Sequence, residues 1–227
     1  MKIVIHSIML SFLILGTGCA VKNADAKKRK SKGAASQPAS LKESQEIKFD
    51  ANKGGYAILA GGCFWCTEGV MEKLPGVLSA VSGYTGGKTA NPTYADVAAG
   101  QTDQREAVFV TFDPKKISYE QVLDAFWKSI DPTQSNGQFA DRGPQYTTAI
   151  YYISDKQRKI AEETKQKLEA SKKFSKPIVT EILKANSFWR AEEYHQDYYK
   201  KKPFKYRQYF IGSGRKRFID KTWGKDT

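Results

Sequence analysis

The chain has 227 residues and a formal net charge of +13, and it contains three cysteines and two histidines. These are too few soft ligands for the usual zinc sets, so we expect no metal site. The basic charge extends over both the N-terminal quarter and the rest of the chain, and we expect most surface lysines simply to be solvated.

The first residues are typical of an export signal. Lys2 precedes an apolar stretch over residues 3–15, which is shorter than the ~20 residues that span a bilayer. The run Leu15-Gly16-Thr17-Gly18-Cys19 resembles a bacterial lipoprotein box. We therefore expect residues 1–19 to be a signal peptide and Cys19 to be lipidated, which anchors the chain in the bacterial envelope, facing the periplasm or the cell exterior. Ordinary cleavage between Ala20 and Ala26 is the alternative.

Residues 20–54 are rich in Lys, Ala, Ser and Gln and poor in large apolar side chains. Such a segment buries too little surface to offset its ordering entropy, so we predict a flexible basic tether. Its cluster over residues 27–30 suits an anionic lipid or cell-wall surface, and we expect no nucleic-acid partner.

The central motif of the chain is a C-x-x-C pair after two glycines. The apolar run at residues 57–60 predicts a strand, Gly61 and Gly62 a tight turn, and the following residues a helix whose first turn carries Cys63. Because a helix N-terminus favours an anion, we expect the pKa of Cys63 to lie below that of a free thiol. Cys66, three residues on, is within reach of a disulfide. A C-x-x-C motif that attaches haem needs histidine directly after the second cysteine. Thr67 occupies that position here, so haem attachment is excluded.

Strands and helices then alternate, which favours an α+β fold built as a two-layer sandwich. A Ser118/Gln121 capping box and a Ser154/Gln157 pair mark two helix starts. The predicted strands cover residues 77–84, 106–112, 146–153 and 178–183, and the helices begin after residues 118 and 154. We expect residues 55–212 to form one domain with a long irregular C-terminal segment, followed by a basic tail at 213–227.

Seven short motifs occur in the order and approximate spacing of the A-type peptide methionine sulfoxide reductases, and the chain resembles that family over residues 56–199. The motifs are Gly62-Cys63-Phe64-Trp65, Gly83-Tyr84-Thr85-Gly86-Gly87, Asn91-Pro92-Thr93-Tyr94, Glu106-Ala107-Val108, Asp131-Pro132-Thr133-Gln134, Asp141-Arg142-Gly143-Pro144-Gln145-Tyr146 and His195-Gln196-Asp197-Tyr198.

The resemblance implies a ferredoxin-like sandwich that reduces methionine S-sulfoxide, free or protein-bound. It implies that Cys63 attacks the sulfoxide sulfur and that Glu106 protonates the oxygen. The other roles that it implies are hydrogen bonds to the oxygen from Tyr84 and Tyr146, a box for the methyl group from Phe64 and Trp65, a loop carboxylate from Asp141, and either a substrate contact or a structural role for His195.

Elementary chemistry supports the pairing of a thiol with a carboxyl. A sulfoxide oxygen cannot leave as a free anion, so the attacking sulfur needs a protonated acid opposite it. Glu106 begins an otherwise apolar strand, where burial would raise its pKa toward the working pH.

The reaction leaves Cys63 as a sulfenic acid, which a second thiol converts to a disulfide. No cysteine follows Cys66, so Cys66 is the internal candidate for this resolving role, and a buried residue without redox function is the alternative. We expect no bound cofactor, an external reductant such as thioredoxin or a small dithiol, and a monomer. Gln104, Arg105 and Thr147 depart from the residues common in the family.

Two other functions fit parts of the sequence. A thioredoxin-type thiol–disulfide oxidoreductase also uses a C-x-x-C at a strand-to-helix turn, but it would lose all activity in Cys66→Ser, whereas a sulfoxide reductase would keep its first turnover. A basic lipoprotein that binds anionic cell-surface polymers would show salt-sensitive binding that survives mutation of Cys63.

Overall fold

The computed structural model describes residues 45–50 and 55–225. The expected signal peptide, Cys19 and most of the expected tether lie outside the described residues. No helix among the described residues combines the length and the apolar character needed to cross a membrane.

A ferredoxin-like unit forms the centre of the fold. Its elements, in chain order, are β2 (Tyr56–Ala60), α1 (Phe64–Met71), β3 (Val77–Thr85), β4 (Arg105–Phe112), α3 (Tyr119–Ser129) and β7 (Ala149–Tyr152). β4 lies between β2 and β3 and is antiparallel to both, which is the split βαβ arrangement. The full sheet has the order β1-β9-β3-β4-β2-β7-β8. The predicted α+β sandwich is confirmed.

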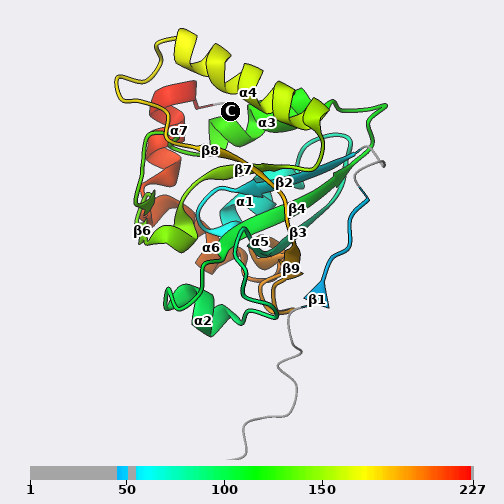
Figure 1. Cartoon of the computed structure of the whole chain (residues 1–227). Helices are drawn as coiled ribbons and strands as arrows, with labels where there is room; N and C mark the ends of the chain where they lie inside the picture. The colour runs from blue at the N-terminus through cyan, green and yellow to red at the C-terminus, as the bar shows by residue number, and fades with distance from the viewer. Residues whose placement is uncertain (1–44, 51–54, 226–227) are drawn as a thin grey trace, which may run out of the picture. The chain divides into compact units, whose positions relative to one another are not determined.

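The central strands are buried on both faces, and alternate residues serve different cores. In β2, Ala57 and Leu59 belong to the larger core, which the helices cover. Ile58 and Ala60 belong to a smaller core on the other face. Figure 1 shows α3 and α4 (Asp155–Ala170) above the sheet, and the Trp127 indole donates to Thr164 Oγ1 at 3.1 Å to tie these helices together.

Short elements complete the edges. The Ser118/Gln121 capping box is present with both of its hydrogen bonds. The strand predicted from residue 146 begins only at residue 149, because Tyr146 closes a 3₁₀ turn that starts at a proline. The remaining bounds are α2 (Tyr94–Ala98), β5 (Gly137–Gln138), β6 (Asp141–Arg142), the 3₁₀ turn (Pro144–Tyr146), β8 (Glu181–Lys184) and β9 (Phe188–Arg190).

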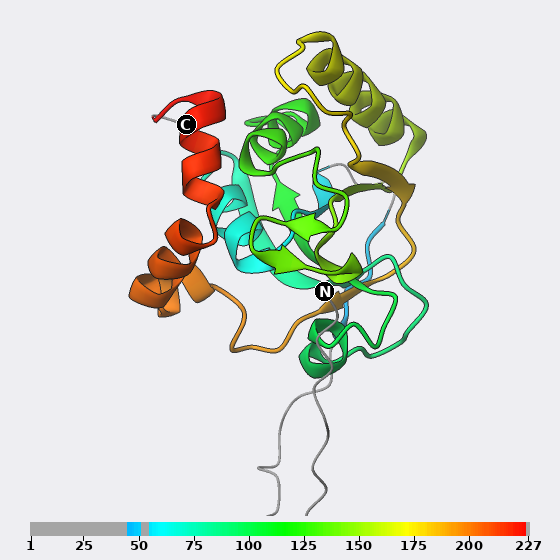
Figure 2. The same cartoon turned by 90° about the vertical axis from the view of Figure 1, so that its left-hand side faces the viewer.

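The C-terminal segment is helical, which corrects the prediction of an irregular segment and a tail. It forms α5 (Tyr198–Lys201), α6 (Pro203–Gly212) and α7 (Arg215–Trp223), which Figure 2 shows along one side of the domain in orange and red. Arg215 and Ile219, which lie within the expected basic tail, are buried. The domain therefore continues through α7.

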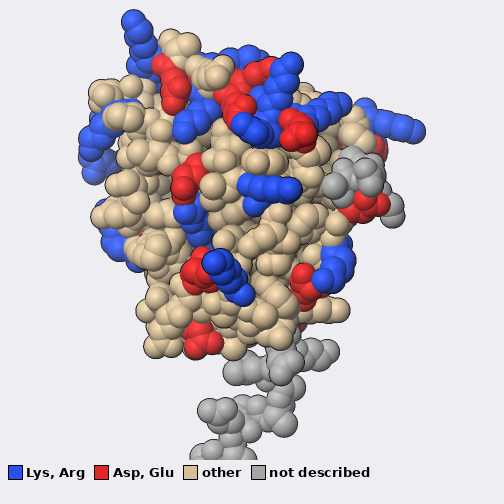
Figure 3. Space-filling view, viewed as in Figure 1, with Lys and Arg blue, Asp and Glu red and all other residues tan. Residues whose placement is uncertain are grey.

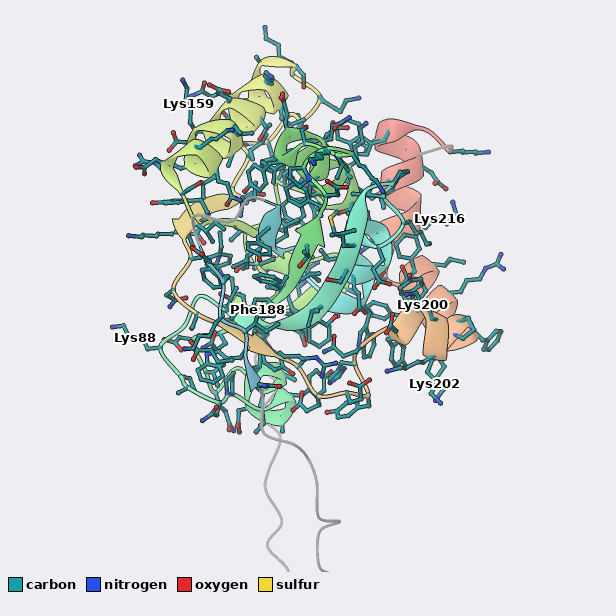
Figure 4. All side chains as sticks on the ribbon, turned by 90° about the vertical axis from the view of Figure 1, so that its right-hand side faces the viewer. Lys88, Lys159, Phe188, Lys200, Lys202 and Lys216 are labelled. Atoms are coloured by element: carbon teal, nitrogen blue, oxygen red, sulfur yellow. The ribbon has the colours of Figure 1, made fainter. Side chains whose placement is uncertain are left out.

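The end of the expected tether is also part of the fold. β1 (Gln45–Glu46) pairs with β9, and Ile47 and Phe49 pack on the smaller core. The Phe49 and Phe109 ring centroids are 6.1 Å apart. Phe188 of β9, labelled in Figure 4, is a fully buried member of the same core. These contacts attach residues 45–49 to the sheet, so the expected tether, which extended to residue 54, overlaps the folded domain.

Candidate active site

The strand-to-helix turn after β2 places Cys63 at the start of α1. Gly62 has φ +79°, and a Cβ at this position would lie 2.5 Å from Gln138 Cβ, so the turn requires glycine. Cys63 is the N-cap of α1 rather than a first-turn residue as predicted. Its carbonyl accepts from the Cys66 N–H at 3.1 Å, and the side chain is 6% exposed. A nearly buried sulfur thus sits at a helix N-terminus.

A small cavity opens at this sulfur. Its volume is ≈ 120 Å³, and its walls come from α1, α2, β4, β6, the 3₁₀ turn and α6. Its lining residues are Cys63, Phe64, Trp65, Tyr94, Glu106, Asp141, Tyr146 and Tyr209. Six of these were predicted from the sequence.

Glu106 supplies an acid to this cavity. It is 2% exposed, and one carboxyl oxygen accepts the Phe64 backbone N–H at 2.9 Å. Burial raises its pKa to about 8, and this exceeds the opposing effect of the Phe64 hydrogen bond. The predicted raised pKa is confirmed in direction, and the carboxyl is mostly protonated at neutral pH.

The two thiols form a buried pair, and the expected lowering of the Cys63 pKa is wrong. Burial raises the pKa of Cys63, and its hydrogen bond to Cys66 and the nearby carboxyls of Glu106 and Asp141 act in the same direction. The pKa of Cys66 is lowered, first because Cys63 donates to it and then because Arg215 lies beside it. Desolvation and the neighbouring Cys66 outweigh the helix N-terminus at Cys63, so the pKa of Cys63 is raised while that of Cys66 is lowered.

Tyr94 lines the cavity, whereas Tyr84 does not. The Tyr84 hydroxyl lies outside the cavity lining and donates to Glu192 at 2.8 Å. The other oxygen of Glu192 accepts the Tyr94 backbone N–H at 2.8 Å. Tyr84 therefore supports the start of α2, whereas Tyr94 and Tyr146 line the cavity as hydrogen-bond donors. Burial raises the pKa of Tyr94 to about 12, so its phenol keeps its proton.

His195 likewise lies behind the cavity rather than in it. Its Nδ1 accepts from the Trp65 indole at 3.1 Å, and burial lowers its pKa to about 4. The neutral ring therefore carries its proton on Nε2, which is buried without a partner among the described residues. Trp65 also stacks on Tyr198, with ring centroids 3.9 Å apart. The histidine fixes the orientation of a cavity wall, which is the structural alternative left open above.

Helix α6 contributes Tyr209 to the wall of the cavity. The Tyr209 hydroxyl of α6 donates to Asp141. Burial raises the pKa of this tyrosine, and the neighbouring Cys63 and Asp141 raise it further. Asp141 is thus held by a hydrogen bond from a segment for which the sequence predicted no regular structure.

Comparisons with known proteins agree with this geometry. A family model described as peptide methionine sulfoxide reductase matches residues 55–227. The chain belongs to the peptide methionine sulfoxide reductase family. The MsrA of Bacillus licheniformis is 55% identical over 175 residues, covering 77% of this chain and 97% of that protein.

Two solved structures of the family resemble the fold. Methionine sulfoxide reductase A of Corynebacterium diphtheriae matches with a TM-score of 0.59 at 32% identity, over 68% of this chain and 78% of that one. Mxr1 from Saccharomyces cerevisiae in reduced form matches with a TM-score of 0.60 at 34% identity, over 70% and 91% respectively.

The departures from the family's common residues lie outside the cavity. Gln104 is buried and joins two loops by accepting the Gly87 N–H at 3.2 Å and donating to the Thr89 carbonyl at 2.7 Å. Arg105 pairs with Glu181, and the Thr147 hydroxyl donates to the Pro144 carbonyl at 2.7 Å. The contacts of all three residues connect loops and strands of this reductase, and none of the three lines the cavity.

The sequence reasoning missed Tyr94, Tyr209 and Arg215. Tyr94 ends one of the seven motifs. Thr93 before it is the N-cap of α2 and its hydroxyl accepts the Asp96 N–H at 3.3 Å. A T-x-x-D capping signal therefore marked the start of the helix that begins at Tyr94. Tyr209 and Arg215 carry no comparable local signal, because only tertiary packing brings α6 and α7 to the thiols.

Proposed function

We propose that the chain reduces methionine S-sulfoxide, free or within proteins, to methionine at the expense of its own thiols. The observation that carries the proposal is one small cavity that holds a buried, mostly protonated carboxyl and a buried cysteine sulfur at a helix N-terminus. A sulfoxide needs both groups, because its oxygen is displaced only as it takes up a proton.

The reaction follows from the cavity lining. Cys63 attacks the sulfoxide sulfur from the form of the thiol pair in which its proton has passed to the hydrogen-bonded Cys66 sulfur, while Glu106 gives its own proton to the oxygen. Tyr94 and Tyr146 donate hydrogen bonds to that oxygen as negative charge builds on it. Phe64 and Trp65 provide an apolar wall for the methyl group. Methionine leaves, and Cys63 keeps the oxygen as a sulfenic acid, so the substrate gains the two electrons that Cys63 loses.

Cys66 then resolves the sulfenic acid. It lies in the first turn of α1, hydrogen-bonded to Cys63, and its pKa is lowered. Its thiolate displaces the oxygen from Cys63 to form a disulfide. An external dithiol of the thioredoxin kind restores both thiols by exchange, and no bound cofactor is needed.

A single-turnover experiment tests the proposal. The reduced full chain is given excess methionine S-sulfoxide without reductant, methionine is counted, and each cysteine is mapped by mass spectrometry. We expect one methionine per chain and a Cys63–Cys66 disulfide. Cys66→Ser should still yield one methionine, with Cys63 oxidised, whereas Cys63→Ser should yield none.

Cys19→Ser is the matched control, because it removes the third thiol and should leave the yield unchanged. A wild-type chain that forms no methionine would refute the proposal and favour a thiol–disulfide oxidoreductase instead. Binding of an anionic polymer is the less favoured function, because Figure 3 shows Lys and Arg interspersed with Asp and Glu on the face in view rather than gathered into one basic patch.

We also propose that the chain is exported and anchored to the envelope through a lipid on Cys19. The support is the sequence pattern at residues 2–19, which matches a signal followed by a lipoprotein box. Expression of the full chain in a bacterium should place it in the membrane fraction with a lipid mass on Cys19, and Cys19→Ala should release it. A cytosolic chain that retains Met1 would contradict this location.

A further inference from the structure

Arg215 is an unusual buried cation. It is the first residue of α7, follows Gly214 at φ +88°, and is 1% exposed. It forms no ion pair with a carboxylate among the described residues. Burying an unpaired charge is costly, and a cation at a helix N-terminus is further disfavoured by the helix dipole. Groups close to the guanidinium must therefore offset the free-energy cost of burying this charge.

Part of that compensation comes from neutral groups. One guanidinium nitrogen donates to the carbonyl of Ser129 at 2.7 Å, and another donates to that of Gly61 at 2.9 Å. Ser129 ends α3, where carbonyls carry partial negative charge. The Phe139 ring centroid lies 4.5 Å from the guanidinium carbon. These contacts hold the Arg215 guanidinium against the glycine turn that precedes Cys63.

The remaining partner is the Cys66 sulfur. Cys66 is 1% exposed, and the Arg215 guanidinium forms a hydrogen bond with it. A Cβ added to Gly62 would lie 3.2 Å from an Arg215 nitrogen, which confirms how closely the guanidinium approaches the C-x-x-C turn. Cys66 is therefore the ionisable group that the buried guanidinium contacts, and the positive charge favours its ionised form.

We propose that Arg215 is a positioning residue for the recycling half of the reaction, in that it holds Cys66 as a thiolate aimed at Cys63. This inference rests on the proposed function. Once Cys63 is a sulfenic acid, the Cys66 thiolate attacks the Cys63 sulfur. The S–S bond forms and the S–O bond breaks. The electron pair of that bond leaves with the hydroxyl group, which takes a proton and departs as water.

Several titratable groups besides Arg215 act on Cys66. Cys63 donates a hydrogen bond to it, and Asp141 of β6 raises its pKa. The others in electrostatic contact are Glu106 of β4 and Tyr206 and Tyr209 of α6. Among these groups only Arg215 carries a positive charge, so its removal should raise the pKa of Cys66 whatever the state of the others.

The test compares Arg215→Met with wild type in the full-chain single-turnover experiment. Methionine release, the Cys63–Cys66 disulfide and Cys63 sulfenic acid trapped by dimedone are followed in time. We expect disulfide formation to slow about tenfold with dimedone-reactive Cys63 accumulating, because a smaller thiolate fraction is only partly offset by a more nucleophilic sulfur. Arg217→Met, on the exposed side of the same helix, is the matched control and should match wild type.

A pH profile separates this role from a merely structural one. In both proteins the disulfide rate should rise with pH as Cys66 ionises and then level off, and in Arg215→Met it should level off at a higher pH than in wild type, because Cys66 has lost a neighbouring positive charge. Arg215→Lys restores the charge and should recover part of the rate. If Arg215→Met fails to fold, Arg215→Lys decides the question, since the loss of the guanidinium hydrogen bond should still move its profile to higher pH.

The outcomes are distinguishable. Normal methionine release together with an unchanged disulfide rate in Arg215→Met would overturn the role of Arg215 alone. Methionine release and disulfide formation falling by the same factor, with no change in pH profile, would make Arg215 structural and also overturn it. A wild-type chain that releases no methionine would overturn the proposed function itself.

Discussion

At the scale of single residues, the central feature is a carboxyl kept neutral by burial. Glu106 accepts one backbone hydrogen bond and is otherwise enclosed, so its pKa lies near 8 rather than at its ordinary value of 4.5. Its proton is thus available over the neutral range, and it is lost as the pH rises through about 8. A general acid of this kind contributes about 100-fold to 10,000-fold in rate.

We therefore expect the rate of methionine formation in the first turnover to fall about tenfold per pH unit above pH 8. Glu106→Gln keeps the shape of the side chain and a hydrogen-bond acceptor for Phe64, but has no proton to give. Its rate should be at least about 100-fold lower, without an alkaline limb at pH 8. Rapid-quench measurement of methionine from pH 6 to 10 checks both points, and an unaltered alkaline limb in the variant would rule out Glu106 as the acid.

The two tyrosines near α2 provide a second comparison at this scale. Tyr94→Phe removes a donor from the cavity and should slow the first turnover by about tenfold or more, as expected for a hydrogen bond to a developing charge. Tyr84→Phe removes only the bond to Glu192 and should chiefly lower stability, by about 1 kcal/mol. First-turnover rates and urea midpoints of both variants decide which tyrosine holds the oxygen, and a larger rate loss in Tyr84→Phe would reverse the assignment.

At the scale of elements, segments at both ends of the chain complete the sheet and the site. β1 covers one edge, and Phe49 beyond it packs on Phe109. Phe49→Ala should cost about 1–2 kcal/mol of unfolding free energy, because a half-buried aromatic ring returns to water. Lys48→Ala in the same segment is exposed and should change stability by less than about 0.5 kcal/mol. Urea unfolding of the two variants tests whether the domain begins before residue 55, and equal midpoints would argue that it does not.

At the scale of the whole molecule, buried titratable groups make stability depend on pH. Glu106 and Glu68 have folded pKa values of about 8 and 7, above the ordinary 4.5. The folded state then binds more protons than the unfolded state over that range, so stability falls as the pH rises from about 4.5 to 8. His195 acts in the opposite direction, since its lowered pKa of about 4 reduces stability as the pH falls below 6.5.

Glu106→Gln should therefore be less sensitive to pH than wild type. Its unfolding free energy relative to wild type is expected to increase between pH 5 and pH 8 by roughly 3–4 kcal/mol. Urea titrations at several pH values provide the measurement. A constant difference between the two proteins would mean that Glu106 does not carry a raised pKa in the folded state.

The sequence predicted those features that depend on local pattern. Alternating apolar runs located the central strands, and the serine caps located α3 and α4. Glu106 was assigned as the acid by the family resemblance, and the apolar strand that it opens explains why burial raises its pKa. The resemblance was taken to place Tyr84 at the sulfoxide oxygen, and neither the motif nor the strand pattern reveals that its hydroxyl turns to Glu192.

The remaining features depend on contacts between distant segments. The pKa of Cys63 was expected to follow the helix N-terminus, but burial and the neighbouring Cys66 dominate it, with smaller contributions from the carboxyls of Glu106 and Asp141. Arg215 and Tyr209 reach the site only because α6 and α7 fold back along α1 and α3. A basic, weakly periodic stretch gives no indication of such packing before the fold is known.

The order of synthesis gives this arrangement a further consequence. Tyr209 and Arg215 lie among the last nineteen of 227 residues, whereas Cys63 belongs to the first third of the chain. A ribosome completes the sheet strands before it adds either of these residues. Until α6 and α7 have been synthesised, a nascent chain thus carries Cys63 without Tyr209 in the cavity wall and without Arg215 beside the glycine turn. The active site is complete only after α6 and α7 have been synthesised and have packed on the domain.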